Sequence, residues 1–303
     1  MDTNWLEDFV CLARTLNFTR AAEERNVTQS AFSKRIKSLE IWAGAALIDR
    51  TSYPAKLSEA GENLLPVAKA TVIDLLRARD EIRSNDRGGL RFSVFAATHT
   101  ISITHLAPLV ARLEGMNQSI RTRVISDNMH ECCRLLTDEA CDFLLCYRHP
   151  RIAMTLDENR FSRIDLRTEQ LLPLSSADAD GNPVWCLPGD RKAPVPHLAY
   201  TNGSFMGGVV SDLLTRKKAF LNVRHMDALS EALKSFAKQG AGIAWLPESS
   251  TAADLADGTL VHAGDESFRC NLTLSMFAAT EKLDDVGQEI WRLLALSSGQ
   301  SGD

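Results

Sequence analysis

The chain has 303 residues, which at about 150 residues per domain predicts two domains, one of which can be divided. Hydrophobic residues make up 45% and charged residues 24%, which excludes a disordered or low-complexity chain. Lys and Arg number 34 and Asp and Glu 39, so the net charge of −5 excludes a polycation that coats nucleic acid along its whole length. Seven scattered cysteines, no basic-then-apolar leader and no apolar run of about 20 residues predict a cytoplasmic protein without a membrane partner.

The first 60 residues predict closely spaced short helices and then a turn between two short strands. Apolar side chains recur every three or four residues between Trp5 and Leu16. A short helix is predicted over 19–25, with Thr19 as its cap, and a longer helix runs from Thr28 to about residue 41. Residues 51–54 read as the turn.

A long helix is predicted from about Ser58, with Pro66 as an irregularity, followed by a linker over 85–89. Its apolar residues step by three or four positions without a local core, which is typical of a helix with a coiled-coil partner. The residues of this stripe include Leu57, Leu64, Ala68, Val72, Leu75 and Ile82.

From Leu90 the pattern alternates between strands and helices, which predicts an α/β domain with a mainly parallel sheet. The predicted strands are 91–97, 120–125, 142–147, two short segments within 164–175, 220–223, 243–246 and 272–278. The predicted helices are 101–113, 132–136, 226–239 and 286–296.

The segment 18–50 has the spacing of a helix-turn-helix, in which the start of the second helix enters the major groove of DNA. Candidate base contacts there are Thr28, Gln29, Ser30 and Ser33, because amide and hydroxyl groups can read base edges. Candidate phosphate contacts are Arg25, Lys34, Arg35 and Lys37, which lie in a stretch without acidic residues. The alternative is a small helical core whose polar face carries lysines.

Many positions in one register resemble the winged helix-turn-helix of LysR-type transcriptional regulators. They are Phe18, Ala21, Ala22, Val27, Gln29, Ser30, Phe32, Ser33, Ile36, Leu39, Glu40, Gly44, Leu47 and Arg50, with Leu57, Ser58, Ala60 and Gly61 after the wing. The resemblance implies a winged helix-turn-helix over 1–60, a linker and dimerisation helix over 61–89, and a two-lobed α/β effector domain over 90–303, similar to periplasmic binding proteins. Lobe I would comprise about 90–165 and 266–303, and lobe II about 166–265.

The same resemblance implies a homodimer or homotetramer that binds double-stranded promoter DNA at an interrupted palindrome, with half-sites about 34 Å apart. It implies that the dimer contacts are Leu57, Leu64, Ala68, Val72, Leu75 and Ile82. RNA polymerase is a further partner that the family admits. Gln29, Ser30, Ser33 and Lys34 would contact the groove, and Arg50 and Lys56 the backbone near the wing.

An effector or an oxidant acting on the C-terminal domain would set the activity. Ligands of such sheets bind beyond the carboxyl ends of strands, and free N–H groups at a helix start suit a small carboxylate. The predicted cleft residues are Thr98, His99, Thr100, Ser102, Cys146, Arg148, Thr201, Asn202, Ser204 and Met206. The alternative is that Thr98 and Thr100 only cap a helix.

Short segments at 126–129, 143–146, 204–207 and 240–248 are similar to the hypochlorite-responsive branch of the family. Cysteine or methionine oxidation is therefore the rival of a metabolite signal. The redox candidates are Cys141, Cys146, Met206 and Met226. The cysteine spacing matches no zinc pattern, so neither a metal nor a cofactor is predicted.

Two other classes of protein are less favoured. An enzyme is disfavoured because the sequence has no Gly-x-Ser-x-Gly elbow, phosphate loop or His-Glu-x-x-His run. A free-standing solute-binding protein is disfavoured by the N-terminal motif and the missing leader.

Overall fold

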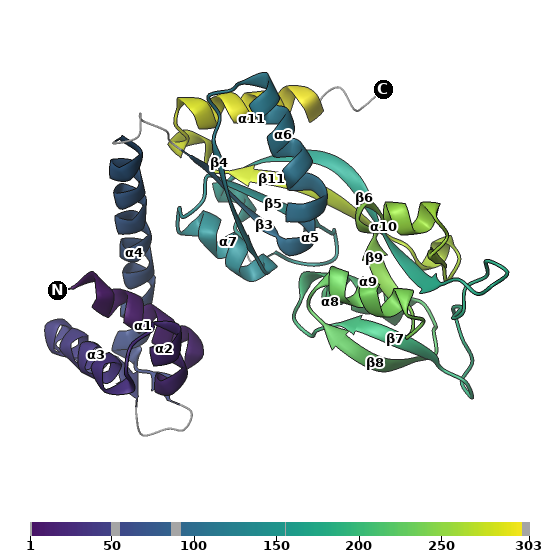
Figure 1. The fold of residues 1–303 in the computed structure, drawn as a ribbon, viewed down its shortest axis with the longest axis horizontal. Coiled ribbons are helices and arrows are strands. Elements are labelled where there is room, and N and C mark those ends of the chain that lie inside the picture. Colours follow the sequence, from purple (N-terminus) through teal and green to yellow (C-terminus); the bar gives the residue numbers. More distant parts are fainter. Residues whose placement is uncertain (1, 50–54, 86–91, 155, 299–303) are drawn as a thin grey trace. The chain divides into compact units, whose positions relative to one another are not determined.

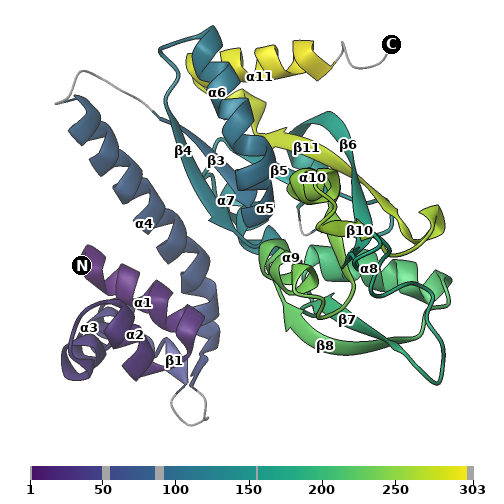
Figure 2. The same ribbon diagram turned by 45° about the vertical axis from the view of Figure 1, so that its right-hand side comes forward.

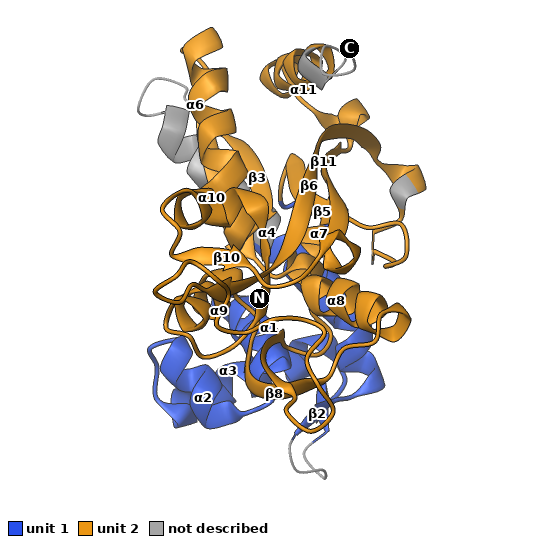
Figure 3. Cartoon of the chain, turned by 90° about the vertical axis from the view of Figure 1, so that its right-hand side faces the viewer, with its two compact units in different colours: residues 1–91, 138–140 blue, residues 92–137, 141–303 orange. Residues whose placement is uncertain are grey.

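The computed structural model describes residues 2–49, 55–85, 92–154 and 156–298. The chain divides into two compact units, one formed by 1–91 with 138–140 and the other by 92–137 with 141–303 (Figure 3). Within the described residues, no helix is long and apolar enough to cross a membrane.

The first unit is a helical bundle with a two-stranded wing and one long helix (Figure 1). Its elements are α1 (Thr3–Thr15), α2 (Phe18–Glu24), α3 (Gln29–Ala43), β1 (Ile48–Asp49), β2 (Lys56–Leu57) and α4 (Glu59–Asn85). Side chains from α1, α2, α3, β1 and α4 form one buried core, which includes Phe9, Phe32 and Ile36.

Polar caps and left-handed residues define the helices of this unit. The side chain of Asn17 accepts hydrogen bonds from the N–H groups of Thr19 and Arg20 and so caps α2. The predicted cap at Thr19 is therefore wrong, because this residue lies inside the first turn. Asn26, with φ of 53°, separates α2 from α3, and Gly44, with φ of 73°, ends α3.

The second unit is built on a mixed seven-stranded sheet with the order β10-β6-β11-β5-β3-β4, in which β9 also pairs with β6. The strands are β3 (Ser93–Thr98), β4 (Thr122–Asp127), β5 (Phe143–Arg148), β6 (Ser162–Ser176), β9 (Ala244–Pro247), β10 (Leu260–His262) and β11 (Cys270–Ala278). Only β4, β3 and β5 run parallel in this sheet, so the prediction of a mainly parallel sheet is corrected.

Helices cover both faces of the lobe I part of the sheet (Figure 2). One face packs on α5 (His99–Ile101), the π-helical segment η1 (Ser102–Leu106), α6 (Ala107–Met116) and α11 (Asp285–Ser298). The other face packs on α7 (Met129–Thr137). Because β3 and β5 are buried on both faces, they read as continuous apolar runs.

Lobe II adds a second sheet, in which β7 (Val195–Tyr200) and β8 (Leu221–Asp227) pair in parallel. Its helices are α8 (Phe205–Arg216), α9 (Ser230–Lys238) and α10 (Glu248–Ala256). The long strand β6 pairs with β11 at one end and with β9 and β10 at the other, and the predicted lobe boundary at 165/166 falls inside it.

Several predicted elements differ from the structure. The two short strands expected within 164–175 are one 15-residue strand, because β11 supplies a continuous ladder for its polar half. The helix expected from Met226 begins at Ser230, and Met226 itself lies on β8, paired with Ala199. The strands β7 and β10 and the helices α8 and α10 were not predicted.

Candidate functional site

The start of α3 presents a polar, exposed surface. Thr28 is the N-cap, and its hydroxyl accepts a hydrogen bond from the N–H of Ala31 at 3.3 Å. Thr28, Gln29 and Ser30 are exposed, and Ser33 is half-buried one turn later. Four of the predicted base contacts therefore gather at one end of one helix.

The basic residues of α3 fall into two groups. Lys34 and Lys37 are exposed. Arg35 instead donates to Asp8 of α1 at 3.3 Å, and Arg25 donates to the same carboxylate at 2.7 Å. Asp8 is fully buried, so both guanidinium groups are engaged inside the unit. This engagement differs from the phosphate contacts predicted for Arg25 and Arg35.

The wing is anchored to the end of α3. The carboxylate of Glu40 accepts hydrogen bonds from the N–H groups of Leu47 and Ile48, at 3.0 and 3.3 Å. A Cβ at Gly61 would lie 2.1 Å from the carbonyl oxygen of Leu47, so only glycine allows α4 to approach the wing this closely. Lys56 is exposed on β2, and the predicted contact Arg50 lies outside the described residues.

Part of the apolar stripe of α4 packs against the core of its own unit. Leu57, Leu64, Ala68 and Val72 pack into the core of the first unit, and Ala68 is only 1% exposed. Leu57, Leu64 and Val72 are only partly buried by this packing, and the assignment of the stripe as dimer contacts stays a prediction. Leu75 is 45% exposed, and the side chain of Ile82 lies outside the described residues.

A cavity of about 420 Å³ lies between the two lobes of the second unit. Six of the predicted cleft residues line it together: Thr98, His99, Thr100, Thr201, Ser204 and Met206. The other lining residues are Asp127, Asn128, Met129, His130, Tyr147, Gly203, Phe205, Ala228, Leu229 and Ser230. The cavity therefore combines apolar side chains with several polar groups, as small-molecule sites do.

Four helix N-termini, those of α5, α7, α8 and α9, contribute to this cavity. Asn128 accepts from the N–H of Glu131 in α7, and Ser204 accepts from the N–H of Gly207 in α8. Within the described part of the chain, no side chain caps the starts of α5 or α9. Their first N–H groups and the helix dipoles therefore favour an anion, which Asp127 in the same wall opposes.

Four predicted cleft residues lie apart from the cavity. The hydroxyl of Ser102 pairs with that of Ser126 at 2.7 Å, and Asn202 is exposed outside the lining. Cys146 is fully buried against α7, and Arg148 lies 3.6 Å from Asp165. These four residues are not among those that line the cavity, and their assignment to the cleft stays a prediction.

The residues that were missed follow one rule. Asp127 is the last residue of β4, and Ala228 directly follows β8. Tyr147 is the last residue but one of β5. Ligands of parallel strands bind at this edge, so the ends of all the parallel strands would have identified these segments. Because the sequence predicts that the helix begins at Met226 and not at Ser230, Ala228 falls inside the predicted helix and not at the strand end.

The redox candidates differ in accessibility. Six of the seven cysteines are buried, including Cys141 and Cys146, and only Cys186 is exposed. Burial raises the pKa of Cys132 in the same cluster to about 12, which opposes formation of the reactive thiolate. Met206 lines the interlobe cavity, whereas Met226 is 49% exposed on β8. In the described ranges, no group of three His, Cys, Asp or Glu side chains could hold a metal.

Two family models match the chain. Residues 3–62 match the model of the bacterial regulatory helix-turn-helix protein of the lysR family, and residues 86–294 match the LysR substrate binding domain. The second match alone covers more than half of the sequence.

Two relatives match this chain over almost its whole length. HTH-type transcriptional regulator YjiE of Escherichia coli (strain K12) is 27% identical over 97% of this chain and 94% of its own. Full-length HypT of Salmonella typhimurium, a hypochlorite-specific LysR-type regulator, has a TM-score of 0.63 at 27% identity and covers 99% of each chain.

A third relative was solved on DNA. Vibrio fischeri DarR, in complex with DNA, has a TM-score of 0.62 at 28% identity and covers 97% of this chain and 98% of its own. With an exposed helix-turn-helix and a two-lobed unit that encloses a ligand-sized cavity, the chain belongs to the LysR family of DNA-binding transcriptional regulators.

Proposed function

We propose that this regulator is controlled by a small carboxylate bound in the interlobe cavity. The observation that carries the proposal is the convergence of four helix N-termini, two of them without a side-chain cap, on one cavity of about 420 Å³. Thr98 and Thr201 come from different lobes, so a ligand between them bridges the lobes. Such a ligand shifts the equilibrium between two states of the regulator only to the extent that its affinity for the two states differs.

On DNA, the proposal assigns base contacts to Thr28, Gln29, Ser30 and Ser33, and phosphate contacts to Lys34, Lys37, Lys56 and Arg50. The protein acts as a homodimer or homotetramer on an interrupted palindrome, since two-fold symmetry pairs two recognition helices. The exposed Gln29 and Lys34 at the start of α3 support this assignment.

An oxidant is the second candidate signal. Met206 in the cavity wall favours it, together with the similarity to a hypochlorite-specific relative over the full chain. Oxidation of a methionine gives a polar sulfoxide, which would alter the apolar part of the cavity. The burial of Cys141 and Cys146 argues against a cysteine sensor.

DNase footprinting of the full-length protein on the DNA beside its own gene tests the DNA-binding assignment. We expect a footprint at low salt, because phosphate contacts are strongest there. Gln29→Ala is expected to alter this footprint, and Lys34→Gln is expected to weaken it. The absence of any footprint at low salt would contradict the assignment.

The same footprint separates the two signals. A library of small carboxylates is expected to change its extent under reducing conditions, and Thr98→Val is expected to weaken that response. If only mild hypochlorite changes the footprint, and Met206→Leu abolishes the change while the matched variant Met226→Leu does not, the oxidant replaces the carboxylate. If neither treatment acts, both proposals fail.

A further inference from the structure

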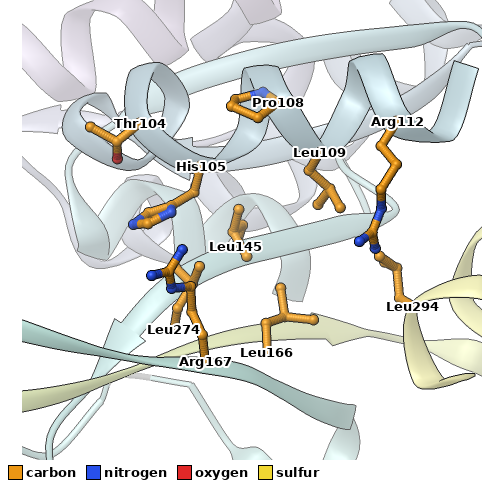
Figure 4. A pocket seen from close by; sticks show the side chains of 10 residues that line it. All are labelled: Thr104, His105, Pro108, Leu109, Arg112, Leu145, Leu166, Arg167, Leu274 and Leu294. Atoms are coloured by element: carbon orange, nitrogen blue, oxygen red, sulfur yellow. The ribbon is translucent and has the colours of Figure 1, made fainter. Parts of the chain in front are cut away.

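The wall of the interlobe cavity carries a negative charge that a simple carboxylate does not match. Among the described residues that line this cavity, Asp127 is the only acidic one, and none is a lysine or an arginine. The cavity within lobe I has the opposite character, because Arg112 and Arg167 line it and no acidic residue is part of its described lining (Figure 4). A ligand of the interlobe cavity must therefore accommodate the carboxylate of Asp127.

The carboxylate of Asp127 is half-buried and only partly satisfied. Its Oδ1 accepts hydrogen bonds from the backbone N–H and the side-chain amide of Asn128, at 2.7 and 3.0 Å. In the described part of the chain, its Oδ2 has no hydrogen-bond donor and the carboxylate has no ion pair. A ligand that displaces water from the cavity removes hydration from this charge, which favours a ligand that brings a cation to it.

Thr100 is a second group of lobe I that faces the cavity without a partner. It is only 8% exposed, and it lines the cavity. Its carbonyl oxygen accepts from the hydroxyl of Thr104, but its own hydroxyl makes no hydrogen bond to any described residue. Thr98 pairs with Asp127 in the register of β3 and β4, so Thr100 and Asp127 follow the same end of two neighbouring strands. A buried hydroxyl without a partner costs free energy, which a ligand that donates to it would recover.

Lobe II supplies the opposite polarity at the start of α9. Leu229 and Ser230 at this helix start line the cavity, and no side chain of the described residues caps the helix. The first N–H groups of α9 and its dipole therefore favour a carboxylate. Glu231 in the same turn is already paired with Lys234 at 2.6 Å, which offsets its charge.

We propose that the effector of the interlobe cavity is a free amino acid with an apolar side chain. Its ammonium group donates to Asp127 and Thr100 of lobe I, and its carboxylate accepts from the N–H groups at the start of α9 in lobe II. The apolar side chain lies against Phe205, Met206 and Leu229, which line the same cavity. This inference rests on the proposed function, and it narrows the small carboxylate named there to a zwitterion whose two charges contact different lobes.

Isothermal titration calorimetry of the full-length protein compares amino acids with the same acids without the amino group. The pairs are leucine with 4-methylpentanoate, methionine with 4-(methylthio)butanoate and phenylalanine with 3-phenylpropanoate, with both enantiomers of each amino acid. The titrations are run at about pH 7.5, where histidine is ordinarily neutral, because His99 and His130 also line the cavity. We expect at least one amino acid to bind tenfold or more tightly than its partner without the amino group.

Asp127→Asn is expected to reverse this preference in part. It removes the charge that attracts the ammonium group and repels a simple carboxylate, so the amino acid should bind more weakly and its partner more tightly. We expect the ratio of the two affinities to fall at least fivefold. The matched control is Asp180→Asn, which removes the same charge from an exposed position outside the cavity and is expected to leave the ratio unchanged.

Thr100→Val tests the same site without altering Asp127, and it is expected to weaken binding of the amino acid at least threefold more than binding of its partner. Equal binding of the two acids of every pair, or a ratio that neither Asp127→Asn nor Thr100→Val changes, overturns the inference. In both cases a bound carboxylate leaves the proposed function intact. If no acid of either kind binds, the inference and the proposed carboxylate signal both fail.

Discussion

Asp8 is a fully buried carboxylate of α1 that contacts two arginines from later parts of the first unit. Asp8→Asn removes a charge that is fully buried and that Arg25 and Arg35 both contact. Breaking a buried ion pair costs about 3–5 kcal/mol. The side chains of Arg25 and Arg35 are 27% and 35% exposed and can turn toward water, so we expect the lower figure of about 2–3 kcal/mol.

Glu7→Gln is the matched control, because Glu7 also contacts Arg25 but its side chain is 29% exposed. Exposed pairs contribute about 0–1 kcal/mol, so we expect a small effect of this substitution. The two variants remove the same charge from neighbouring positions of α1, and they differ mainly in burial.

Hydrogen exchange of the full-length protein, read by mass spectrometry, measures the effect within the first unit alone. A loss of about 2 kcal/mol accelerates exchange of protected amides in α1, α2 and α3 by about 30-fold, while peptides from α8 remain unchanged. If Asp8→Asn accelerates exchange no more than Glu7→Gln does, the buried pair does not hold the helices together and the reasoning is wrong.

Three further predictions concern charge, pH and thiols. Lys34→Gln and Lys37→Gln should each reduce the salt dependence of DNA binding by about one unit of slope, whereas Arg35→Gln should lower stability instead, which salt titrations and urea unfolding distinguish. Burial lowers the pKa of His197 to about 4, below its ordinary 6.5, so the unfolded chain binds the proton first and stability falls as the pH drops from 6.5 toward 4. Between pH 7 and 4.5, His197→Phe should therefore lose about 2–3 kcal/mol less stability than the unaltered protein, and equal losses in urea unfolding would contradict this. Ellman's reagent should modify one thiol rapidly in the native protein, and Cys186→Ser should abolish that phase; a second rapid thiol would show that a buried cysteine is accessible.

The first unit could be predicted largely from the sequence because its signals are local. Thr28 caps α3 and Gly44 ends it, and both positions are visible in the sequence. The partner of the α4 stripe was not visible. The same spacing of Leu64, Ala68 and Val72 suits a second copy or the chain's own core; the structure buries Ala68 in that core and packs Leu64 and Val72 partly against it.

In the second unit, the continuous apolar run of β5 concealed which side chains face the cavity. Cys146 and Tyr147 are neighbours on one strand, so they face opposite sides of the sheet. A strand that is buried on both faces shows no alternation of polar and apolar residues, and the sequence therefore favoured Cys146 where the structure places Tyr147. The bulge at Leu166 depends on pairing with β11, which no local pattern of β6 reveals.

The unbroken strand β6 limits how the two lobes can move apart. One end of this strand pairs with β11 in lobe I and the other with β9 and β10 in lobe II. Opening the lobes must therefore twist or bend a strand that is hydrogen-bonded in both lobes. The pairing of β6 in both lobes would therefore limit the angle through which the lobes move when the regulator passes between its two states.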